Sequence, residues 1–255
     1  MKKLLLLALC LFAVHGLRAH DHIEVGIDPD VPGRLGLSGP GYQLALYVPK
    51  GEPFSFYLPQ FPGGYYPAEL TFSAEGDVLD FATGSLPKIE LVSLTSGPEG
   101  AHFSFWEVGA TTPTWTRPVG WAAADGDRPS IVVYEDGTGY GHIHGRAFTV
   151  DKPGLYQVVF RAVDNASART ASLPKNVTFE ALLTPQLSIK IQNGDAKLAF
   201  TSRLNLTYDL QVSTNLQTWT NVEAHRFVDG TGGVIELSDP LAGRLRVFYR
   251  LVEYY

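Results

Sequence analysis

Short runs of β-branched and aromatic residues, separated by turns rich in glycine and proline, limit what this chain can fold into. The 255 residues include 26 glycines and 17 prolines, and few stretches keep a helical period of apolar residues. Turn signals recur at 31–33, 61–64, 135–137 and 151–154. Many short strands joined by such turns predict an all-β sandwich rather than helices packed on a parallel sheet.

The strand pattern predicts two domains. A boundary falls near residues 184–186, so we expect a larger immunoglobulin-like β-sandwich over 20–184 and a small accessory β-sandwich over 185–255. In the small domain Trp219 and Tyr249 are expected in the core. The expected strands are 42–48, 53–58, 70–72, 89–94, 102–108, 130–134, 145–150, 154–162 and 176–183, then 187–192, 197–201, 208–212, 219–222, 233–237 and 247–253.

The first residues are typical of a secretory signal peptide. Lys2 and Lys3 precede an apolar run, Leu4 to Val14, which is too short to span a bilayer. A cut after Ala19 would remove residues 1–19 and leave no transmembrane segment. The sequence therefore predicts a secreted protein, periplasmic or extracellular.

Cleavage changes the charge and the available metal ligands. Removal of Lys2, Lys3 and Arg18 leaves 17 basic residues against 26 acidic ones, a formal net charge of −9. Such an acidic chain is a poor partner for nucleic acid or anionic lipid. Neither cysteine nor methionine remains, which excludes disulfides and sulfur ligands, so any metal site must use nitrogen and oxygen.

Four of the seven histidines form two pairs, each with one residue between its members. These pairs are His20 with His22 and His142 with His144. In a strand this spacing puts both side chains on one face, and two such strands, adjacent or facing, could converge four imidazoles on a Zn²⁺ ion. Glu24 continues the first face and offers an oxygen ligand. The alternative is that each pair marks a solvated strand face or a hydrogen-bonded pair.

Two further histidines lie outside these pairs. His102 begins the expected strand 102–108 and is either a further ligand or a histidine of the core or its rim. His225 is expected in an exposed loop and has no assigned role.

The cleavage site opens a copper alternative. A mature chain beginning His20-Asp21-His22 could chelate Cu²⁺ or Ni²⁺ through its amine, backbone amides and imidazole. The amine and ring of His20 could also form the histidine brace that lytic polysaccharide mono-oxygenases use on a β-sandwich. This alternative predicts a copper oxidoreductase acting on polysaccharide.

The first domain resembles the secreted surface-anchored protein domain of bacteria, whose members accompany metal transporters or respond to zinc. The resemblance rests on His22-Ile23-Glu24, on the run Gly97 to Trp106, and on the run Gly141 to Tyr156 that contains His142-Ile143-His144. The chain departs from the family in Gly145-Arg146 and in the lack of a C-terminal sorting motif. The C-terminal segment resembles a small β-domain that ends many secreted proteins of Verrucomicrobia-like bacteria, through residues 208–220 and 248–250.

The resemblance implies that His22, His142 and His144 are shared ligands. It also implies a role in metal acquisition, storage or sensing at the cell surface, with a metal transport system as a partner. We therefore expect a non-enzymatic zinc-binding protein whose fourth ligand is His20, Glu24 or His102.

A third hypothesis is an adhesive or carbohydrate-binding module. Tyr65, Tyr66, Trp115 and Trp121 could form a surface on which sugars stack, although rim and core positions are the more ordinary role of such aromatics. Hydrolase chemistry has little support, because the sequence contains no Gly-x-Ser-x-Gly elbow, no His-Glu-x-x-His motif and no phosphate loop.

Overall fold

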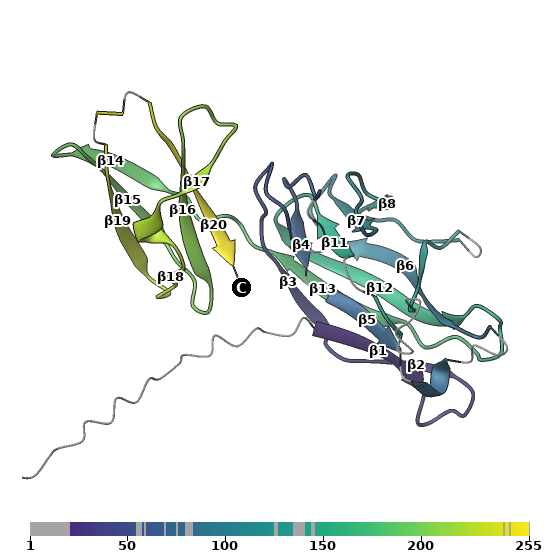
Figure 1. Ribbon diagram of the computed structural model, residues 1–255. Helices are drawn as coiled ribbons and strands as arrows, with labels where there is room; N and C mark the ends of the chain where they lie inside the picture. Colours follow the sequence, from purple (N-terminus) through teal and green to yellow (C-terminus); the bar gives the residue numbers. More distant parts are fainter. Residues whose placement is uncertain are drawn as a thin grey trace, which may run out of the picture.

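The chain folds into two all-β parts (Figure 1). The computed structural model describes residues 21–54, 58, 60–68, 70–74, 76–79, 84–124, 127–134, 141–143, 146–241, 243–244 and 246–254. For Asp21, Asp77, Gly141 and His142 it describes the backbone alone. Besides strands, the described residues include two short 3₁₀ helices, η1 (Gly76–Val78) and η2 (Glu223–His225).

The first part contains a sheet of four strands. Its order is β10 (Gly141–His142), β5 (Leu70–Ala74), β1 (Asp21–Ile27) and β2 (Leu35–Ser38). Strands β1 and β5 run parallel, and the other two pairs are antiparallel. The strand that carries His22 and the strand that carries His142 therefore lie on opposite sides of β5.

A larger sheet of nine strands packs against the first one. Its strands run mostly antiparallel, with one parallel pair, β3 with β13. The order is β8 (Trp115–Pro118), β7 (His102–Trp106), β11 (Ala147–Val150), β4 (Tyr66–Ala68), β3 (Tyr42–Ala45), β13 (Lys175–Ala181), β12 (Gly154–Asp164), β6 (Pro87–Ser96) and β9 (Ser130–Val132).

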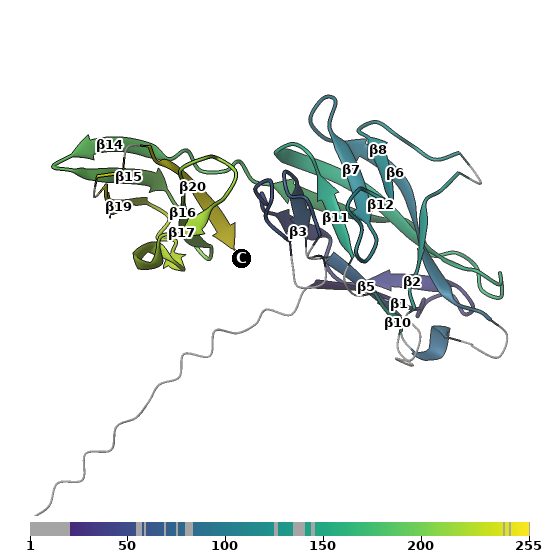
Figure 2. The same ribbon diagram turned by 45° about the horizontal axis from the view of Figure 1, so that its top comes forward.

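The two sheets of the first part face each other (Figure 2), and buried phenylalanine rings pack between them. Phe72 of the smaller sheet meets Phe148 and Phe160 of the larger one edge-on, with ring centroids 5.9 and 5.4 Å apart. Phe103 stacks on Phe148 at 5.6 Å and meets Phe179 at 5.1 Å. All five rings are buried, so this aromatic cluster is the main apolar contact that holds the sandwich together.

The second part is a small sandwich with its own apolar core. One sheet contains β14 (Ser188–Gln192), β15 (Asp195–Thr201) and β19 (Val234–Pro240). In the other, β16 (Thr207–Ser213) pairs with β17 (Thr220–Asn221), β18 (Val228–Asp229) and β20 (Phe248–Tyr254). Phe200 and Tyr208 meet at 4.9 Å between the sheets, in a cluster separate from the core of the first part.

Two arginines join the parts. Arg250 forms an ion pair with Glu52 of the first part, and its guanidinium lies 4.4 Å from the centroid of the Trp219 ring. Arg203 donates to the carbonyl of Leu183 in the connecting segment and to Glu253 at 2.9 Å. Leu44, Leu46 and Leu182 also pack against the core of the second part.

The all-β sandwich class predicted from the sequence is confirmed. Most expected strands are present, with boundaries shifted by a few residues. The expected strand 53–58 is not found at its described positions 53, 54 and 58, while β2, β4, β8 and β18 were not expected. Tyr249 packs against the small core as predicted, whereas Trp219 is half-buried beneath Arg250 instead of lying in that core.

The part of the chain that the structure describes includes no helix long and apolar enough to span a membrane.

Candidate metal centre

The candidate ligands of the first strand lie on the outer face of the four-stranded sheet. Strand alternation buries Ile23 and Val25 against the core and turns His22 and Glu24 to the opposite face. His22 is half-buried, and Glu24 is exposed. Among the described residues, the Glu24 carboxylate takes part in no hydrogen bond or ion pair. The outer face thus presents one imidazole and one accessible carboxylate.

The register of the sheet aligns the second strand with the first. Glu24 pairs with Ser73 of β5, and Ser73 pairs on its other side with the backbone of His142. His22 pairs with Thr71, two residues away along β5. Because neighbouring strands lie about 4.8 Å apart, β1 and β10 are separated by roughly 10 Å across β5. The sequence predicts that the two histidine strands are adjacent or facing. In the structure β1 and β10 instead lie on either side of a third strand, β5.

The strand between them carries small polar side chains on this face. Thr71 and Ser73 are both buried, and Thr71 donates its hydroxyl to the carbonyl of Ile143 at 2.5 Å. The Ser73 hydroxyl is fully buried and has no hydrogen-bond partner in the described region. A buried hydroxyl without a partner is costly, so its presence calls for an explanation such as a bound ion or water.

The structure describes only part of the remaining predicted ligand set. His20 and His144 lie outside the described residues, and for His142 only the backbone is described. Within the described side chains, no three histidines or carboxylates gather closely enough to hold a metal ion.

His102 lies in the other sheet, at the start of β7. Its Nδ1 is 2.8 Å from one oxygen of Asp151, and its backbone amide donates to the other oxygen at 2.8 Å. This double contact ties β7 to the turn between β11 and β12. His102 is thus brought together with Asp151 rather than with His22 or Glu24.

His225 has a structural contact in the second part. It ends η2, and its Nε2 lies 2.9 Å from the carbonyl oxygen of Ser238.

The motif runs around Gly97 and Gly154 meet at that same turn. Gly154 has φ +143°, and a Cβ there would lie 2.6 Å from Cγ of Pro98, so only glycine fits. A Cβ on Gly97 would lie 2.7 Å from the Tyr156 ring. Tyr156 is buried, which raises the pKa of its phenol, and the phenol donates to the carbonyl of Lys152 at 2.6 Å. These residues shape the turn that carries Asp151.

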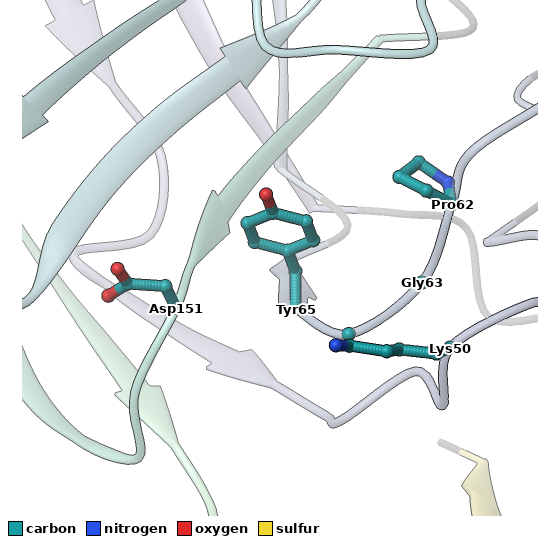
Figure 3. Close-up of a pocket in the computed structure, with 6 residues that line it drawn as sticks. Lys50, Pro62, Gly63, Tyr65 and Asp151 are labelled. Atoms are coloured by element: carbon teal, nitrogen blue, oxygen red, sulfur yellow. The ribbon is translucent and has the colours of Figure 1, made fainter.

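Asp151 also lines an open pocket of about 460 Å³ (Figure 3). The rest of its lining comes from the segment around Lys50 and from Pro62-Gly63-Gly64-Tyr65. Tyr65 lies between Asp151 and Pro62 in the close-up (Figure 3). The sequence singles out Tyr65 and the turn before it but not Lys50 and Asp151, because no spacing in the chain connects these two residues with Tyr65.

The four aromatics of the carbohydrate hypothesis do not form one surface. Tyr66 is buried in the main core. Trp115 stacks on Phe105 at 5.5 Å, and Trp121 lies under the guanidinium of Arg117 at 5.0 Å. Of the four, Tyr65 alone lines the pocket.

Comparison with known proteins gives this chain no relative to argue from. No family model matches it, no curated protein matches it, and no solved structure matches it.

Proposed function

We propose that the protein is a secreted, non-enzymatic binder of a divalent metal ion, with zinc as the resident ion. The proposed ligands are His22 and Glu24, which lie on the outer face of the four-stranded sheet, together with His142 of β10 and His144. The observation that carries the proposal is the row Glu24–Ser73–His142 across three strands, beside His22.

Three features of this row support it. Imidazole and carboxylate are ligands that Zn²⁺ accepts in tetrahedral sites, at about 2.0–2.1 Å for nitrogen. Thr71 and Ser73 on β5, the strand between the two outer strands, carry short hydroxyl side chains instead of bulky apolar ones, and both are buried. The partnerless hydroxyl of Ser73 sits at the centre of the row, where it would hydrogen-bond to a ligating oxygen or to water on the ion.

His102 is not part of this proposal. Its Nδ1 already contacts Asp151, and its strand belongs to the opposite sheet. We therefore expect metal binding to depend on His22 and His142 and to be independent of His102. At the cell surface or in the periplasm such a site would serve metal acquisition, storage or sensing, in contact with a metal transport system.

Zinc titration of the metal-free mature protein by calorimetry tests the proposal. We expect one equivalent to bind, and we expect His142→Ala or His22→Ala to abolish binding. His102→Ala and His225→Ala are matched controls that keep it. Metal-free protein that takes up no zinc would overturn the proposal, as would full binding by His142→Ala.

A serine variant tests the role of the row itself. Ser73→Ala removes a buried hydroxyl that has no partner, so the metal-free protein should unfold at the same denaturant concentration or a higher one. Its zinc affinity should fall about tenfold or more, because outer contacts orient the ligands. Unchanged zinc affinity would exclude Ser73 from the site. Preferential binding of copper, with His20 as the first residue, would support the copper alternative instead.

A further inference from the structure

The pocket beside Asp151 is built on a rigid base. A small apolar cluster of Leu58, Phe61, Trp106 and Ala147, which we call the satellite core, lies apart from the main core. Tyr65 packs against it, with ring centroids 5.2 Å from Trp106 and 5.9 Å from Phe61. The indole of Trp106 is itself fixed by a 2.9 Å hydrogen bond to Thr149. The aromatic side of the pocket is therefore held in place before any ligand arrives.

The backbone that leads into Tyr65 is also constrained. The amide of Gly64 donates to Val48 at 2.7 Å, and that of Gly51 donates to Pro62 at 2.9 Å. Gly63 has φ +66°, and a Cβ there would lie 1.9 Å from the carbonyl oxygen of Pro49. The two loops thus touch through a residue that must be glycine, and they leave bare backbone at the pocket wall.

Two opposite charges face this space. Asp151 is half-buried, and its two oxygens are oriented by the amide and ring of His102, yet each keeps a lone pair for a ligand. Lys50 is exposed, and its ammonium makes no ion pair with any described residue. Figure 3 shows Asp151 and Lys50 on different sides of Tyr65. The described lining residues offer acceptors, donors and an aromatic ring, and their two charges cancel.

From this geometry we infer that the pocket binds a neutral saccharide. Hydroxyl groups both donate and accept, so a sugar can satisfy the Asp151 carboxylate and the Lys50 ammonium at once, while its C–H face packs on Tyr65. A volume of about 460 Å³ is within the range of small-ligand sites and suits one or two sugar rings. Polyanions are disfavoured, because Lys50 is the single cation among the described lining residues and the chain carries a formal net charge of −6.

The inference is independent of the metal proposal. The pocket residues come from the β3–β4 connection and from the turn after β11, and they share no side chain with the row Glu24–Ser73–His142. Saccharide binding should therefore be the same in EDTA and in zinc. Loss of zinc binding would leave saccharide binding unaffected, and the reverse also holds.

Calorimetry on the mature full-length protein tests it with defined probes. The neutral probes are maltotetraose, cellotetraose, mannotetraose and N-acetylated chitotetraose, and the acidic control is tetragalacturonate. We expect at least one neutral probe to bind with a Kd below about 1 mM, and tetragalacturonate to bind at least tenfold more weakly.

Variants identify the residues. Tyr65→Ala should weaken binding of the best probe at least tenfold, and Asp151→Asn, which keeps an oxygen for the His102 amide, about tenfold. Tyr42→Ala replaces a tyrosine of β3 that does not line the pocket and should leave binding unchanged. Because Tyr65→Ala could disturb the satellite core, Lys50→Met provides a second variant at an exposed side chain and should also weaken binding.

Three results would overturn the inference. The first is the absence of binding of every neutral probe by wild-type protein. The second is unchanged affinity in folded Asp151→Asn and Lys50→Met. The third is tetragalacturonate binding as tightly as the neutral probes, which would contradict the charge argument.

Discussion

Asp164 shows how a single buried carboxylate is kept charged in this fold. Its side chain is 1% exposed, and it accepts hydrogen bonds from the Ser85 hydroxyl, the amide of Ala166 and Arg169. Burial alone would raise the pKa of Asp164, but these donors and the nearby guanidinium outweigh it and hold the pKa below its ordinary value. The same arginine donates to the carbonyl of Val78, so the network ties the end of β12 to η1.

We expect Asp164→Asn to lower the free energy of unfolding by about 3 kcal/mol at pH 7, because Arg169 is left without its carboxylate. A carboxyl group with a lowered folded pKa stabilises above its unfolded pKa, and this stability is lost as pH falls through the folded pKa. The difference between wild type and variant should therefore be constant above about pH 5 and shrink below about pH 4. Urea unfolding across this pH range measures it.

Asp195→Asn is the control, since the side chains of Asp195 and its partner Lys197 are 32% and 42% exposed, against 1% for Asp164. Its unfolding midpoint should fall much less than that of Asp164→Asn. Equal effects of the two variants, or a difference that persists in acid, would contradict the assignment of Asp164.

Two glycines of the pocket loops allow the stability cost of backbone strain to be distinguished from the cost of a steric overlap. Gly51 and Gly63 both have positive φ, +83° and +66°, but a Cβ on Gly51 would meet nothing within 4 Å. Gly51→Ala should cost about 1–2 kcal/mol from backbone strain alone. Gly63→Ala should cost clearly more, because its Cβ would overlap the Pro49 carbonyl. Thermal unfolding of both variants checks the order, and equal costs would contradict the close contact.

At the scale of the element, β14 shows where alternation fails as a guide to burial. Ile189 and Ile191 pair with Leu198 and Ala196, so their side chains share the core-facing side of the sheet. They are nevertheless 50% and 61% exposed, whereas Leu198 is buried. Among the described strands β14 pairs with β15 alone, at the edge of its sheet, and the exposure of its isoleucines means that the second sheet leaves them uncovered.

Ile191→Thr should therefore change the free energy of unfolding by less than about 0.5 kcal/mol, while Leu198→Ala should cost about 2–5 kcal/mol. Denaturant unfolding of the two variants measures the contrast. A large loss in Ile191→Thr would mean that β14 is covered in solution.

At the scale of the whole molecule, the junction sets how far the two parts behave as one. The second part has about 70 residues, a size at which an isolated domain is only marginally stable. Arg250 connects it to the first part through Glu52, and burial lowers the pKa of Arg250 while that carboxylate opposes the shift. The contact with Trp219 belongs to the same junction.

We expect Arg250→Met to lower the melting temperature of the second part by about 5 °C or more and to leave that of the first part unchanged. Differential scanning calorimetry of the full-length protein resolves this. Arg226→Met is the matched control, because Arg226 lies over the Phe227 ring at 4.8 Å and pairs with residues of its own part. The same shift in both variants would mean that the contact of Arg250 with Glu52 does not stabilise the second part more than an ion pair within that part does.

Local signals in the sequence account for much of this structure. Period-two alternation and glycine-proline turns predict the all-β class and most strands, because both depend on near neighbours in the chain. The spacing of His20 with His22 and of His142 with His144 likewise predicts ligands in pairs, which stays a prediction. Long-range pairing decided the rest. It put β5 between β1 and β10, joined His102 to Asp151, and assembled a pocket from Lys50, Tyr65 and Asp151. Strand order and the meeting of distant loops follow from packing the whole core, so no local pattern could reveal them.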